Sequence, residues 1–158
     1  MAGETHYGGV HSETTRKTSS ETVNNSSTLQ NDDAFSFTGV ANRVYRVVIW
    51  GAVTQVDATA GFKCCLTGAQ ISTIRQSLSY MESSASANPD RWAGYNTSAG
   101  TGITAAGGTI GSGSILFEAT VVMDGTGGTV NFQWAQQTAT AADTILLLNS
   151  TMGVDRIL

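Results

Sequence analysis

After residue 28, apolar and polar residues alternate with a period of two in short runs along most of the chain. Because successive side chains of a strand point to opposite faces, this pattern predicts half-buried β-strands. Gly, Ser, Thr, Asn and Asp separate the runs, as in antiparallel β domains. The predicted strands cover residues 34–38, 43–53, 61–67, 71–80, 115–123, 130–137, 144–148 and 152–158.

These runs predict an all-β fold, an antiparallel two-sheet sandwich that is jelly-roll-like and occupies residues 29–158. The runs 115–123 and 130–137 are expected to form a hairpin, since the Gly-rich connection between them tolerates the positive φ of a short turn. The last two runs are expected to pair with each other and close the chain.

Residues 1–28 are polar and cannot bury enough surface to fold alone, so we predict an extended N-terminal arm. Two interpretations stay open, a disordered tail and a tether that becomes ordered against a partner. The tether hypothesis gives contact roles to Tyr7, Val10, Arg16, Lys17 and Val23.

Two predicted strands carry apolar residues on both faces, which is typical of a strand covered on both sides. Val48 and Trp50 lie on the face opposite Tyr45, Val47 and Ile49. Leu146 and Leu148 likewise alternate with Ile145 and Leu147. We predict a subunit interface at Val48, Trp50, Leu146 and Leu148, with a cyclic homotrimer as a natural closed arrangement. The alternative is that the arm or a long loop of the same chain covers these strands.

Residues 82–113 interrupt the alternation with a long Gly-, Ala- and Ser-rich segment, within which we predict one short strand at 102–106. Loops of this length are usually functional or ordered by a partner. Arg91, Trp92 and Tyr95 place aromatic rings among polar groups, a composition that suits stacking on sugars or a protein contact. The alternative is that Trp92 and Tyr95 fold back and fix the loop.

Charged residues make up 13% of the chain, against about a quarter in typical domains, and the net charge is −4. We therefore expect no nucleic-acid partner and no anionic membrane partner. The sequence has no apolar run of membrane-spanning length and no signal peptide, so we expect folding in the cytoplasm.

Groups that catalyse reactions are scarce in this sequence. Both histidines fall in the arm, and the Gly-rich segments 107–113 and 125–128 lack the ending of a phosphate-binding loop. We expect a protein that is not an enzyme, with no catalytic residue, no metal and no cofactor. Asp32 and Asp33 fit a turn before a strand.

Cys64 and Cys65 are neighbours, so we expect reduced thiols, one in the core and one on the surface.

Three segments resemble small virion proteins of tailed bacteriophages. They are residues 27–33 leading into Phe35, Ser36 and Phe37, the segment 130–136, and the closing stretch 146–158. The resemblance spans residues 27–158. It implies a non-enzymatic β-sandwich that serves as a trimeric decoration or cement protein on capsids, or as a module of a tail appendage.

This resemblance gives the arm and the interface an expected role. The leading hypothesis is a capsid decoration protein on the virion exterior, made in the host cytoplasm, which binds the major capsid protein as a homotrimer and uses its arm as a capsid tether. The alternative is a tail-fibre or spike module that binds host-surface glycans through Arg91, Trp92 and Tyr95.

Overall fold

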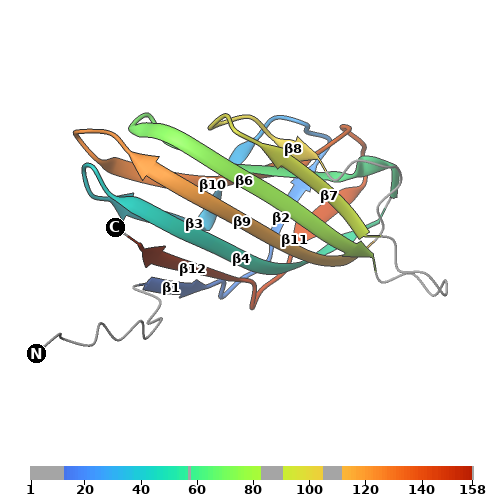
Figure 1. Ribbon diagram of the computed structural model, residues 1–158. Coiled ribbons are helices and arrows are strands. Elements are labelled where there is room, and N and C mark those ends of the chain that lie inside the picture. The colour runs from blue at the N-terminus through green and yellow to red at the C-terminus, as the bar shows by residue number, and fades with distance from the viewer. Residues whose placement is uncertain (1–12, 57, 83–90, 105–111, 158) are drawn as a thin grey trace, which may run out of the picture.

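The computed structural model describes residues 13–56, 58–82, 91–104 and 112–157, and it shows two antiparallel sheets packed face to face (Figure 1). This confirms the predicted all-β two-sheet sandwich. The strands are β1 (Glu13–Arg16), β2 (Glu21–Asn24), β3 (Gln30–Gly39), β4 (Val44–Gln55), β5 (Phe62–Thr67), β6 (Ile71–Glu82), β7 (Arg91–Asn96), β8 (Ile103–Thr104), β9 (Gly113–Met123), β10 (Gly128–Gln136), β11 (Asp143–Leu146) and β12 (Thr151–Arg156), with a short 3-10 turn at Ala58–Ala60.

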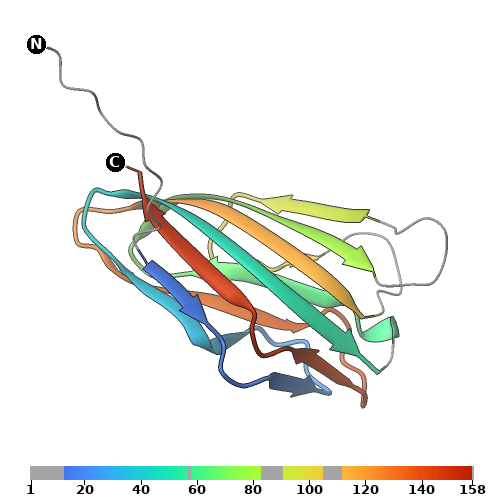
Figure 2. The same ribbon diagram turned by 90° about the horizontal axis from the view of Figure 1, so that it is seen from below.

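Strands β3 to β10 have the connectivity of a jelly roll. One sheet has the order β3-β10-β5-β8, and the other contains β4-β9-β6-β7. Beside β4 the second sheet is extended by β12 and β1, which lie side by side in Figure 2, and by β11 and β2. We call the sheet β3-β10-β5-β8 the smaller sheet, and the sheet that contains β4 and β9 the larger sheet.

Two predicted strand pairings are wrong. Strand β9 pairs with β4 and β6, whereas β10 pairs with β3 and β5, so the connection between them crosses from one sheet to the other. Strands β11 and β12 do not pair with each other; both pair with β4, one after the other along its length. Alternation identifies the buried face of a strand, but it does not distinguish a partner beside the strand from one in the facing sheet.

The predicted boundary of the arm at residue 28 is also wrong in part. β1 pairs with β12 and β2 pairs with β11, so residues 13–24 form the outer edge of the larger sheet. An edge strand of this kind needs backbone hydrogen bonds more than apolar side chains, which is why a polar segment forms it. Tyr7 and Val10 lie outside the described residues.

Residues 91–96, predicted as a loop, form β7 and pair with β6. Gly94 allows β7 to approach β8, because a Cβ at this position would lie 2.5 Å from both Ile103 Cγ2 and the Thr104 carbonyl oxygen. β8 matches the first part of the short strand predicted at 102–106, whose last two residues are not described.

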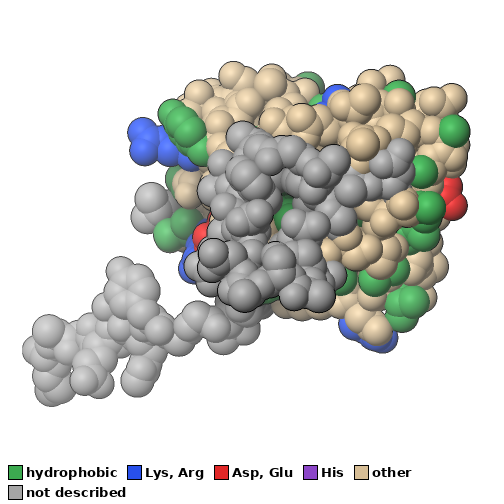
Figure 3. All heavy atoms as spheres, turned by 90° about the vertical axis from the view of Figure 1, so that its right-hand side faces the viewer, with side chains coloured by type: hydrophobic (Ala, Val, Ile, Leu, Met, Phe, Trp, Pro, Cys, Tyr) green, Lys and Arg blue, Asp and Glu red, His purple; other side chains and the backbone are tan. Residues whose placement is uncertain are grey.

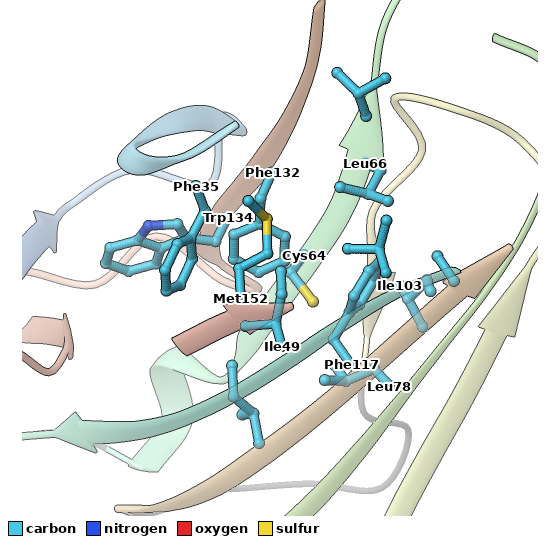
Figure 4. Close-up of a cluster of buried hydrophobic side chains, with 14 of the residues drawn as sticks. Phe35, Ile49, Cys64, Leu66, Leu78, Ile103, Phe117, Phe132, Trp134 and Met152 are labelled. Atoms are coloured by element: carbon cyan, nitrogen blue, oxygen red, sulfur yellow. The ribbon is translucent and has the colours of Figure 1, made fainter. Parts of the chain in front are cut away.

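Inward side chains of both sheets form one hydrophobic core, part of which Figure 4 shows. The Phe132 ring lies 6.1 Å from the Phe35 ring and 5.4 Å from the Phe117 ring, in edge-on arrangements. Both cysteines are free and buried, so the prediction that one of the two lies on the surface is wrong. Burial raises the pKa of the Cys64 thiol well above its ordinary value and that of Cys65 to about 11.

Candidate interaction surface

Strands β4 and β9 run through the middle of the larger sheet, and alternate residues of each point away from the core. The register places Trp50 between Leu116 on β9 and Thr151 on β12. Two residues earlier, Val48 lies between Glu118 and Gly153. Because Gly153 has no side chain, the surface beside Val48 is hollowed.

Apolar side chains gather on this outer face. We define the apolar patch as Val48, Trp50, Met81, Leu116 and Leu148. Its most open members are Trp50, Leu148 and Met81, which are 60%, 50% and 45% exposed. One hollow is lined by Val48, Trp50 and Leu116 among others, and an adjoining hollow by Trp50, Met81 and Leu148. A contiguous exposed apolar patch on a small domain indicates an interaction surface.

Three of the four predicted interface residues, Val48, Trp50 and Leu148, belong to the patch. Leu146 does not, because it is fully buried in the core. Strand β11 ends at Leu146, and the Ser150 N–H donates to the Leu147 carbonyl oxygen in a turn (3.3 Å). The turn breaks the alternation, so Leu146 and Leu148 lie on different sides of the sheet.

Leu116 and Met81 were not identified from the sequence. Leu116 alternates with the buried residues Ile115 and Phe117, so the test for two-sided apolar strands would have found it if applied to β9. Met81 comes one residue after the predicted end of its strand at residue 80, and β6 continues to Glu82.

A more polar groove of about 410 Å³ adjoins the patch. Arg46 and Glu118 line both the groove and the neighbouring hollow, and they form an ion pair at 2.9 Å. Exposed ion pairs of this kind contribute little to stability. The other lining residues are Arg75, Gln76, Ser77, Tyr95, Ala119 and Thr120.

Tyr95 lies on β7 with 77% of its surface exposed, at the rim of the polar groove. The backbone register places Arg91 opposite Met81 and Trp92 opposite Tyr80. The predicted contact loop is therefore an edge strand, and of its three residues Tyr95 is the one whose side chain is described. The edge position still leaves Tyr95 accessible to a ligand.

The arm residues have different environments. Arg16 is exposed at the end of β1, and its Nη1 donates to Asn149 Oδ1 at 2.5 Å. Lys17 and Val23 are 2% and 3% exposed, which corrects their predicted role as tether contacts. Val23 packs in the core, and the Lys17 side chain turns inward at the bend between β1 and β2.

Charged side chains are sparse at the end of the sandwich that Figure 3 shows, where uncharged atoms cover most of the visible described surface. Across the described ranges, no group of three or more His, Cys, Asp or Glu side chains is placed to hold a metal ion. The same ranges contain no helix with the length and apolar character needed to cross a membrane.

The chain matches no protein-family model, and no curated protein matches it in sequence.

Proposed function

We propose that this chain is a non-enzymatic structural protein of a tailed-phage virion, a capsid decoration or cement protein that binds the major capsid protein on the outer shell as a homotrimer. The observation that carries the proposal is the apolar patch on the outer face of the larger sheet. The jelly-roll connectivity and the resemblance to small virion proteins support the choice of protein class.

The patch supports self-association because it combines a large exposed aromatic residue with aliphatic neighbours. Trp is among the residues that contribute most to interfaces when they enter a desolvated pocket. Val48 and Leu116 line the hollow next to Trp50, and the ion pair of Arg46 and Glu118 forms its charged rim. In a cyclic trimer, each patch contacts a neighbouring copy and is withdrawn from water.

In this proposal residues 1–12 of the three copies act as capsid tethers. These residues precede β1 at the edge of the larger sheet and include Tyr7 and Val10. An extended segment can add to an exposed sheet edge on a capsomer through main-chain hydrogen bonds. Three linked tethers gain avidity without more contacts per chain.

A virion inventory tests the location of the protein. Quantitative mass spectrometry of purified particles is expected to find the chain in a number comparable with that of the major capsid protein, as decoration requires. In a second step, particles stripped of the chain should rebind the full-length protein but not a variant that lacks residues 2–12. A few copies per particle, or equal rebinding by both proteins, contradicts the proposal.

The polar groove favours a second candidate, a tail-fibre or spike module that binds host-surface glycans. Tyr95 offers an exposed ring for stacking on a sugar, and Arg46, Arg75 and Glu118 offer hydrogen-bonding groups beside it. Tyr95→Ala should then abolish binding to glycans or host cells and leave particle assembly unchanged. Unchanged binding by this variant counts against the glycan function.

A further inference from the structure

Lys17, Asp32 and Glu21 form a buried cluster between the edge of the larger sheet and β3 of the smaller sheet. Lys17 Nζ lies 2.6 Å from Asp32 Oδ2 and 3.1 Å from Glu21 Oε2. The side chains of Lys17, Asp32 and Glu21 are 2%, 0% and 13% exposed. The Phe35 ring, whose centroid is 5.5 Å from Nζ, provides an apolar wall.

Hydrogen bonds with the backbone hold Lys17 and Asp32 in place. The Lys17 N–H donates to the Ser150 carbonyl oxygen and the Lys17 carbonyl oxygen accepts from the Asn149 N–H, both at 2.9 Å. Asp32 lies where the pairing of β3 with β10 shifts register. Its Oδ1 accepts the N–H groups of Ala34 at 2.9 Å and Phe35 at 3.0 Å.

This arrangement resembles the stabilising groups of an acyl-transfer site. Two backbone N–H groups on Oδ1 are placed to stabilise negative charge on that oxygen when a nucleophile adds to the carboxyl carbon. The nucleophile is the Lys17 amine, which contacts the other oxygen of the same carboxyl group. Glu21 contacts Nζ and is therefore placed to accept and return a proton.

We propose that Lys17 and Asp32 condense into an intramolecular isopeptide bond, with Glu21 as the catalytic acid and base. The Lys17 Nζ–Asp32 Cγ bond forms and the Cγ–Oδ2 bond breaks. Of the three protons on the Lys17 ammonium, one stays on the amide nitrogen and two leave with Oδ2 as water. Glu21 ends in its starting protonation state, and the step requires no oxidant, reductant or co-reactant.

Charge and proximity both favour this step. The reaction removes one positive and one negative charge from a site where ions lose their hydration, and it leaves a neutral amide. The amide oxygen, formerly Oδ1, keeps both backbone hydrogen bonds. Well-oriented groups within one molecule react with effective molarities of about 10⁵–10⁸ M. Burial raises the pKa of Glu21 above its ordinary value of 4.5, which helps its carboxylate to accept a proton.

The link would join the bend between β1 and β2 covalently to β3. A force applied to residues before Glu13 would then reach the smaller sheet through a covalent bond instead of through edge-strand hydrogen bonds alone. This inference does not depend on the proposed capsid function, and its test is separate from the virion experiments.

Intact-mass spectrometry of the purified full-length chain under denaturing conditions tests the proposal. The expected mass is lower, by one water molecule, than the mass calculated from the sequence with the same N-terminus. Peptide mapping should recover a branched peptide that joins Lys17 to Asp32. A mass equal to the calculated one overturns the proposal, as does a water loss that maps elsewhere, for example to a succinimide at Asp124.

Three variants distinguish the roles of the residues. Lys17→Arg should show the full calculated mass, and Glu21→Gln should form the link more slowly or not at all. Asp33→Asn changes an exposed neighbouring carboxyl group and should lose water as the wild type does. Circular dichroism checks that each variant is folded. A water loss in Lys17→Arg would place its source outside the cluster and overturn the assignment even if that variant folds poorly.

Discussion

At the scale of single residues, Asp124 shows how one carboxylate holds the connection between the two sheets. Its Oδ1 accepts the N–H of Thr126 at 2.8 Å, the Thr126 hydroxyl at 2.7 Å and the N–H of Gly127 at 3.1 Å. Gly127 has a φ of 68°, a conformation that favours glycine. Hydrogen bonds from Thr126 and then Gly127 lower the pKa of Asp124 below its ordinary value of 3.8.

A lowered carboxyl pKa in the folded state stabilises the protein above the ordinary pKa, and this stabilisation is lost as the pH falls through the folded-state value. Asp124→Asn keeps an acceptor but removes the charge. Urea unfolding should therefore show a stability difference between wild type and Asp124→Asn at about pH 7 that shrinks at about pH 2.5. A difference that is equal at both pH values contradicts this role of the charge.

At the scale of elements, the edge strand β7 depends on the close approach that Gly94 permits. In Gly94→Ala the new methyl group meets the Thr104 carbonyl oxygen, which is backbone and yields little. We expect a loss of about 1–3 kcal/mol in the free energy of unfolding, measured with urea.

Gly125→Ala is the matched control, because a Cβ there has no neighbour within 4 Å. Its free energy of unfolding should stay within about 0.5 kcal/mol of the wild type. Equal stability of the two variants would mean that β7 does not pack closely on β8.

The N-terminal segment divides into two parts with different expected effects on stability. Removal of residues 1–12 should leave the free energy of unfolding within about 0.5 kcal/mol of the wild type. Removal of residues 1–24 also deletes β1, β2 and the core side chain of Val23, and it leaves Asp32 buried without Lys17. That truncation should cost at least about 3–5 kcal/mol or prevent folding. Thermal unfolding of both truncations measures the contrast, and equal melting temperatures contradict it.

The sequence predicted the strands better than their partners. Alternation in residues 43–53 and 115–123 correctly gave the inward faces of β4 and β9, because burial of one face selects apolar residues there. It could not show that β10 lies in the facing sheet, since a strand presents the same alternation to a neighbour and to an opposite layer. The strands β1 and β7 escaped prediction because edge pairing uses backbone groups, which every residue has.

The sequence predicted those residues of the candidate interaction surface that lie on the outward face of a regular strand. Val48 and Trp50 stand out as apolar residues on the wrong side of a strand, and the structure places both on the outer face. The prediction put Leu146 on the same face as Leu148, because the pattern of alternation does not reveal the turn that begins at Leu147. The pairing of Lys17 with Asp32 was hidden because it joins two sheets across a separation of 15 residues.

At the scale of the whole molecule, the outer faces of the two sheets differ. The smaller sheet presents polar residues to solvent, among them Ser36, Thr38 and Thr129. The larger sheet presents the apolar patch with Trp50 at its centre. The proposed function depends on this asymmetry, because it assigns the contact with other copies to the face that carries the apolar patch.

Trp50→Lys places a charge in the middle of the apolar patch without changing the core. If Trp50 is a central interface residue, the substitution should weaken association by about 2 kcal/mol or more, which is roughly 30-fold in affinity. Ser36→Lys adds the same side chain to the exposed outer face of the smaller sheet and should leave association unchanged. Equal weakening by both variants would point to a general charge effect.

The most direct test of self-association through the apolar patch is sedimentation equilibrium of the full-length chain at micromolar concentration. The account predicts a species with three times the mass of one chain, and a shift of Trp50→Lys toward the monomer under the same conditions. A wild-type protein that sediments as a monomer, or a Trp50→Lys variant that remains as trimeric as the wild type, would contradict it.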